Sequence, residues 1–188
     1  MPSTYLVVRV QVMAVVVIRA TVVQKNNVMN RKESIAALLA QLDQRSPAGF
    51  AIALHVRFTR PTYLFQTYAK PWMDHYTEAG LVMHDPVVRW GLQNTGRLRW
   101  SDLTEIDDAA VFAQARDHGL MNGAGIAIVL SESRTIAAFA RADREYTDEE
   151  LEEFEDLLTR LHQATLGIER LSTRDQRALT ELSITLTH

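Results

Sequence analysis

The chain has 188 residues, 47% hydrophobic and 23% charged, which is enough for one globular domain with a substantial core. Its formal net charge of -3 and pI near 6.1 give no general attraction to nucleic acid. Cysteine is absent, which excludes disulfides, thiolate metal ligands and cysteine nucleophiles. We therefore expect a cytoplasmic protein.

Residues 1–28 form an atypical leader rich in valine. Its longest uncharged run, Val10–Ile18, is far shorter than the roughly 20 residues that a membrane helix needs. No small-residue cleavage site follows it, as a signal peptide would require. We interpret the segment as a non-native leader, with Met29 as a natural start; an extra edge strand and a membrane contact are the alternatives. Apart from that last alternative, we expect no membrane partner for the chain.

The first regular element after the leader is an amphipathic helix. Asn30–Glu33 has the pattern of a capping box, and helical spacing places one apolar side on Ile35, Leu38, Leu39 and Leu42. The helix is expected to end near Ser46-Pro47. Two β-like runs follow, Gly49–Thr59 and Tyr63–Tyr68, and the intervening Arg60-Pro61 predicts a hairpin.

The stretch from Tyr68 to Trp100 carries the densest chemistry of the chain. Tyr68, Trp72 and Tyr76 lie four residues apart, as along one face of a helix. Further on, Asp85 is placed to cap a new helix whose first position suits Pro86. Taken singly, each aromatic residue indicates ordinary core packing, and Asp85 indicates a helix cap.

The second half of the chain predicts a helix, a hairpin and a long helix. The expected ranges are Glu105–His118, closed by Gly119, and the strands Gly123–Leu130 and Thr135–Ala142. Thr147–Glu150 is a capping box for the long helix, whose buried face would carry Leu151, Phe154, Leu158 and Leu161. This order predicts an α+β fold, an antiparallel sheet with helices on both faces.

Four motifs together resemble the signal-binding domain of LuxR-type quorum-sensing transcriptional regulators over roughly 35–170: Tyr68-x3-Trp72-x3-Tyr76, Asp85-Pro86, Trp100, and Ala115-x3-Gly119-Leu120-x2-Gly123. The resemblance implies an α/β/α sandwich with a central antiparallel sheet of about five strands. It also implies an N-acyl-homoserine lactone as ligand, no further cofactor, ligand-coupled folding, and a homodimer or a heterodimer with LuxR-type regulators. We therefore place an autoinducer-binding domain at residues 29–170.

The same resemblance assigns three residues to the polar head of the ligand. Trp72 would donate its indole N–H to the lactone carbonyl, and Asp85 would accept the amide N–H. Tyr68 would donate its hydroxyl to the acyl carbonyl. Each polar atom of the head group would thus meet a side chain of the opposite hydrogen-bonding character.

Four more residues would surround the apolar parts of the ligand. Trp100 would pack flat against the lactone ring, and Tyr76 would form a wall beside the acyl chain. Val111 and Ala115 would line the tail pocket. All of these contacts are implied by the resemblance and not by the spacing itself.

The chain departs from its relatives at two places in the expected site. Val87 stands where many relatives have a small hydroxyl residue. The residue nearest the acyl carbonyl in the second hairpin would be Ala138, Phe139 or Ala140, and none has a hydroxyl. These departures favour an unsubstituted or aromatic acyl group over a 3-oxo chain.

Residues 171–188 resemble a linker and the first helix of a truncated helix-turn-helix domain. Since a recognition helix is required to read the major groove, we expect no DNA binding by this chain alone. It would be either a domain cut from a longer regulator or a naturally short protein that sequesters signal or heterodimerises with full-length regulators. The acidic helix 148–170 would then be the contact surface.

An enzyme that degrades the lactone is the rival hypothesis. The chain has no HExxH motif and no GxSxG nucleophile elbow. His75, His84 and His118 could be considered as metal ligands together with Asp74 and Asp85, but their spacing matches no common metal site. We therefore expect no catalytic residue and no metal.

Overall fold

The chain folds around a five-stranded antiparallel sheet in the computed structural model, which describes residues 30, 31 and 33–167. The strand order is β2-β1-β5-β4-β3, with every neighbouring pair antiparallel. Both edge strands are short. The strands are β1 (Gly49–Val56), β2 (Tyr63–Gln66), β3 (Gly96–Arg99), β4 (Asn122–Leu130) and β5 (Ser133–Arg141).

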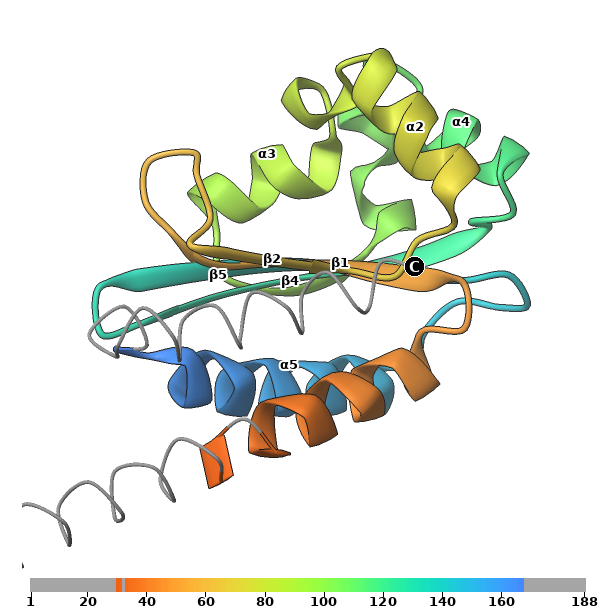
Figure 1. The fold of residues 1–188 in the computed structure, drawn as a ribbon. Helices are drawn as coiled ribbons and strands as arrows, with labels where there is room; N and C mark the ends of the chain where they lie inside the picture. Colours follow the sequence, from red (N-terminus) through yellow and green to blue (C-terminus); the bar gives the residue numbers. More distant parts are fainter. Residues whose placement is uncertain (1–29, 32, 168–188) are drawn as a thin grey trace, which may run out of the picture.

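Helices cover both faces of the sheet (Figure 1). A helix over residues 33–45 and α5 (Asp148–Thr165) lie on one face. The other face carries α2 (Lys70–Glu78), η1 (Leu81–Met83), α3 (Pro86–Gln93), η2 (Trp100–Ile106) and α4 (Val111–Asp117). The expected α/β/α sandwich is therefore confirmed. No helix in the described part of the chain is long and apolar enough to cross a bilayer.

Each face of the sheet has its own apolar cluster. On the α5 face, Phe50, Ile52 and Leu54 of β1 are buried against the two long helices. The expected buried positions of those helices are confirmed: Ile35, Leu38, Leu39, Leu42, Leu151, Phe154, Leu158 and Leu161. Successive strand residues point to opposite faces, so Ala51 and Ala53 face α2–α4. Their small side chains leave space between the sheet and those helices.

Local capping signals were accurate where they fall within the described residues. Thr147 and Glu150 form the expected capping box of α5. Asp85 caps α3, with Pro86 at its first position. The leader 1–28, the segment 171–188 and part of the predicted Asn30–Glu33 box lie outside the described residues.

The structure differs from the predictions in the middle of the chain. The predicted helix Glu105–His118 is divided into the end of η2 and the shorter α4, because Ala110 takes a left-handed conformation (φ 53°). The Asp107 carboxylate accepts the N–H groups of Val111 and Phe112 and starts α4 there. Strand β3, only four residues long, was not predicted. Tyr68 precedes α2, so it does not share the helix face of Trp72 and Tyr76.

Candidate functional site

A cavity of about 400 Å³ lies between the sheet and the helices α2–α4. Its wall is mostly apolar and is built from β1, β2 and the loop between them, β5, α2, η1, α3, η2 and α4. All eight residues expected to contact ligand lie in this wall: Tyr68, Trp72, Tyr76, Asp85, Val87, Trp100, Val111 and Ala115. The structure thus brings together residues that lie up to 47 positions apart in the chain.

Asp85 is the acidic group of the cavity wall. Its Oδ1 accepts the N–H groups of Val87 (2.8 Å) and Val88 (3.3 Å), and its Oδ2 accepts the Tyr76 hydroxyl (2.9 Å). Burial raises the pKa of Asp85, and these three hydrogen bonds oppose that rise. Because a carboxylate oxygen accepts two hydrogen bonds, Oδ2 retains capacity for one further donor.

The two tyrosines of the wall are hydrogen-bond donors. Burial, reinforced by the charge of Asp85, raises the pKa of both Tyr68 and Tyr76, so their hydroxyls stay protonated. The Tyr68 hydroxyl donates to the carbonyl of Ala138 at 3.2 Å. The Tyr76 hydroxyl donates to Asp85 and so positions its carboxylate. Tyr76 was expected only to pack beside the acyl chain, so this contact is an addition to its predicted role.

Trp72 is held by a cluster of aromatic rings. It packs edge-on against Tyr76 (5.4 Å between centroids) and tilted against His118 (5.5 Å), while His118 stacks on His75. The side chain is 5% exposed. Its indole N–H makes none of the hydrogen bonds found among the described residues. The buried indole N–H of the cavity wall that lacks a partner within the described residues is that of Trp100.

Trp100 is fixed on both sides by its neighbours. Phe112 stacks almost parallel to it, with 5.1 Å between ring centroids and 16° between planes. A Cβ on Gly123 would lie 2.0 Å from Trp100 Cε2, so only glycine fits beneath the indole. This close approach explains the glycine of the Gly119-Leu120-x2-Gly123 motif. Trp100 was expected to pack flat on the lactone ring; in the structure the indole is stacked by Phe112 and approached closely by Gly123.

The floor of the cavity is poor in polar groups. Of the three candidates in the second hairpin, Ala138 lines the cavity, Phe139 packs in the cluster beneath α5, and Ala140 belongs to the cluster on the cavity side of the sheet. Val87 is 2% exposed and also lines the cavity. The cavity floor therefore has no side-chain hydroxyl at position 87 and none at the three hairpin positions 138–140.

Several wall residues were missed by sequence reasoning. They include Ala51, Ala53, Met73, Phe112 and Ile136. The alternation of small and large residues along β1 is a signal that would have located the two alanines. Phe112 and Ile136 have no comparable local signal, since only the packing of α4 over the sheet places them.

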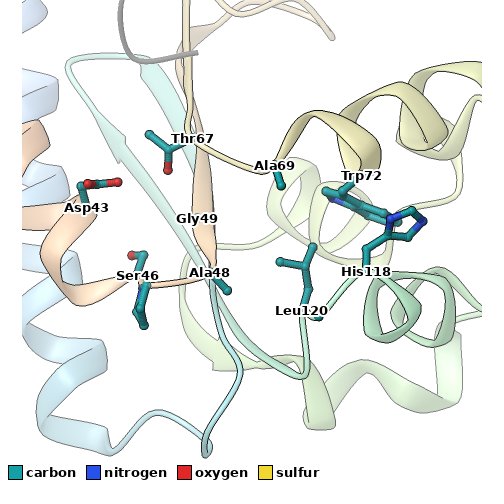
Figure 2. Close-up of a pocket in the computed structure, with 11 residues that line it drawn as sticks. Asp43, Ser46, Ala48, Gly49, Thr67, Ala69, Trp72, His118 and Leu120 are labelled. Carbon is teal, nitrogen blue, oxygen red and sulfur yellow. The ribbon is translucent and has the colours of Figure 1, made fainter. Parts of the chain in front are cut away.

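A second hollow of about 340 Å³ lies at the end of the sheet where β1 begins and β2 ends (Figure 2). Asp43, Ser46 and Thr67 lie on one side of it, and Trp72 and His118 on the other. Trp72 therefore lies in the walls of both hollows. Among the described residues, no group of three or more His, Cys, Asp and Glu is placed to hold a metal ion.

The domain is an antiparallel sheet covered by helices on both faces, and its largely apolar cavity has a few polar groups in the wall. This combination defines a small-molecule-binding domain. The family described as "Autoinducer binding domain" matches residues 33–165. The chain therefore belongs to this family of LuxR-type sensory domains.

Two transcriptional activators resemble parts of the chain. VanR of Vibrio anguillarum is 32% identical over 72 residues, which cover 37% of this chain and 30% of VanR. SolR of Ralstonia nicotianae is 35% identical over 60 residues, or 32% of this chain and 25% of SolR. The matched segments thus span less than a third of either relative.

Solved structures share the fold. SdiA in complex with octanoyl-rac-glycerol has a TM-score of 0.56 at 22% identity, covering 82% of this chain and 70% of SdiA. The solution structure of SdiA1-171 from Escherichia coli has a TM-score of 0.55 at 25% identity, covering 78% and 90%.

Proposed function

We propose that the domain senses an N-acyl-homoserine lactone by enclosing it in the cavity. The observation that carries this proposal is the combination of an apolar wall with three different polar groups: the Trp72 indole N–H, the Asp85 carboxylate and the Tyr68 hydroxyl. The ligand has two carbonyls, one amide N–H and an apolar tail, so it needs two donors, one acceptor and an apolar surface.

Each polar group is assigned to one atom of the ligand. Trp72 donates to the lactone carbonyl. Asp85 Oδ2 accepts the amide N–H at its remaining position, in a charge-assisted hydrogen bond. The Tyr68 hydroxyl turns from the Ala138 carbonyl, where its bond is long, to the acyl carbonyl.

The ligand tail runs over the alanine floor. Ala51, Ala53 and Ala138 contribute no polar atom from their side chains and little volume. An oxo group at the third carbon of the tail would lose its water there without gaining a hydrogen bond from a side-chain hydroxyl. We therefore propose an unsubstituted or aromatic acyl group as the preferred tail.

Binding stabilises the folded domain. A ligand at a hundredfold excess over its Kd contributes about 2.7 kcal/mol, which is large beside a typical total stability of about 5–15 kcal/mol. We propose that signal concentration controls the amount of folded protein in the cytoplasm, as the sensing part of a dimeric LuxR-type regulator of transcription.

The test is a thermal-shift series of the protein with acyl-homoserine lactones of different tails. At a hundredfold excess over Kd, a domain of this size should gain about 5–10 °C in Tm. Mass spectrometry of the recovered ligand should find intact lactone. A Tm that no lactone changes would refute the proposal, and opened lactone would replace sensing with hydrolysis.

A further inference from the structure

The solvent-exposed part of the cavity wall lies at one end. These residues are Thr59, Pro61 and Leu64 of the β1–β2 hairpin, Val82 and Met83 of η1, and Arg89 of α3. By contrast, Trp72, Val87 and Val111 are at most 5% exposed. The cavity therefore opens between the hairpin, η1 and α3. Figure 1 shows the loop between β1 and β2 rising from the sheet on the side of α3.

Large exposed apolar side chains lie at this opening and at the tip of the adjoining hairpin, where Phe58 precedes the wall residue Thr59. Phe58 at the tip of the hairpin is 100% exposed, Met83 is 75%, Val82 is 49% and Leu64 is 44% exposed. One exposed apolar residue is ordinary, but four beside one opening indicate a contact surface. Phe58 also has a left-handed backbone (φ 57°), which is unusual for a bulky residue.

The hairpin tip holds Phe58 between two arginines. Arg57 and Arg60 exchange backbone hydrogen bonds of 2.9 and 3.0 Å, which close the turn. Both side chains are exposed, and neither takes part in the ion pairs found within the described ranges. Arg89 adds a third positive charge, partly offset by Asp108 at 3.4 Å.

The opening is therefore locally positive although the chain as a whole has a net charge of -3. The β4–β5 turn lies next to the hairpin, because Arg134 at the start of β5 pairs with Val56 at the end of β1. Glu132 is the acidic residue of this turn. Arg134 itself donates to the carbonyls of Gly91 and Asn94. Four arginines, Arg57, Arg60, Arg89 and Arg134, thus stand against two carboxylates, Glu132 and Asp108, and Asp108 contacts Arg89.

We propose that this rim, defined as residues 57–60 with Leu64, Val82, Met83 and Arg89, docks on an anionic lipid bilayer. Phe58 enters the region between headgroups and acyl chains, while Arg57 and Arg60 bind lipid phosphates. A protruding apolar tip between cations suits a fluid anionic surface, which requires no shape complementarity. The docked cavity then exchanges amphiphilic ligands with the bilayer without exposing their tails to water.

This docking surface departs from the expectation that the domain has no membrane partner. That expectation rested on the lack of a spanning segment, whereas docking depends on which side chains share one opening. The exposed apolar residues and the cationic residues of the rim together come from three elements, the β1–β2 hairpin, η1 and α3.

Vesicle co-sedimentation of the whole chain, without any lactone, tests the proposal. Vesicles of phosphatidylcholine with added phosphatidylglycerol should bind the protein, vesicles of phosphatidylcholine alone should bind it weakly, and high salt should reduce binding. Replacing Arg57 and Arg60 together by glutamine should weaken binding roughly 25-fold, about fivefold for each charge. Phe58→Ser should weaken it roughly tenfold or more.

Matched controls are available at the other end of the molecule, beside the hollow of Figure 2 that includes Leu120. Arg116→Gln removes an exposed arginine of α4, and Met121→Ser removes a side chain 44% exposed. Both should bind vesicles like the unchanged protein, and all variants should keep its Tm. Binding that the rim variants leave unchanged, or no binding to anionic vesicles, would overturn the proposal. So would a Phe58→Ser variant that separates a dimer, because a second protein copy would then cover the rim.

Discussion

Asp85→Asn is the most informative change to the candidate site. Asparagine is about as good a helix cap as aspartate, so its side-chain oxygen can still accept the N–H groups of Val87 and Val88. The position of Oδ2 would become an NH2 group facing the Tyr76 hydroxyl and, in our proposal, the ligand amide. A donor would then meet a donor.

The expected loss of lactone affinity is the contribution of one hydrogen bond to a charged group. Such a bond contributes about 1.5–3 kcal/mol, so Kd should rise roughly 10- to 100-fold. At a ligand concentration of a hundredfold excess over the unchanged Kd, stabilisation should fall from about 2.7 to about 0.4–1.4 kcal/mol. The Tm gain on adding lactone should shrink in proportion.

Asp107→Asn is the matched control. Asp107 accepts two backbone N–H groups at the start of α4, at 2.7 and 2.9 Å, but it does not line the cavity. The charge of Asp107 acts on Asp85 from a distance, but Asp107 makes no direct contact with the proposed ligand position, so titration calorimetry should give a much smaller rise in Kd for this variant than for Asp85→Asn. Equal Kd values for Asp85→Asn and the unchanged protein would refute the assignment of Asp85 to the ligand.

The same assignment has a pH signature. The ordinary carboxyl pKa is 3.8 and burial raises that of Asp85, so the folded, ligand-free protein binds the proton more tightly than the unfolded chain. Ionised Asp85 therefore lowers the stability of the ligand-free fold as pH rises through the raised pKa. Lactone affinity should change in the opposite sense, falling as pH is lowered through that pKa, and this dependence should disappear in Asp85→Asn.

Three further changes test other parts of the site. Trp72→Phe should weaken lactone binding roughly 3- to 10-fold in calorimetry, since one neutral donor is lost, and unchanged affinity would remove Trp72 from the head-group set. Gly123→Ala should lower the free energy of unfolding in denaturant titrations by about 1–3 kcal/mol, because the new Cβ meets Trp100; an unchanged value would contradict the close packing. Ala138→Ser should raise the relative affinity for 3-oxo lactones in a competition assay, and an unaltered ranking would show that this floor position does not select the tail.

Part of the fold was predictable because it depends on local rules. The Thr147–Glu150 box and the Asp85-Pro86 cap are read from neighbouring residues alone. The apolar faces of the first helix and of α5 follow from helical periodicity over many residues. Short elements lack such a signal: β3 has four residues, and the break at Ala110 depends on the capping of α4 by Asp107.

The sequence by itself determined the α+β class, the long elements and the eight candidate residues, because their spacing carries both the periodicity and the family resemblance. Only the tertiary structure decided how these residues meet. The Tyr76–Asp85 hydrogen bond and the Phe112–Trp100 stack join elements that are separate along the chain. The exposure of Phe58 near the opening likewise depends on how separate elements pack together. Periodicity reports which face of one element is buried, whereas strand order and register decide which faces share a cavity.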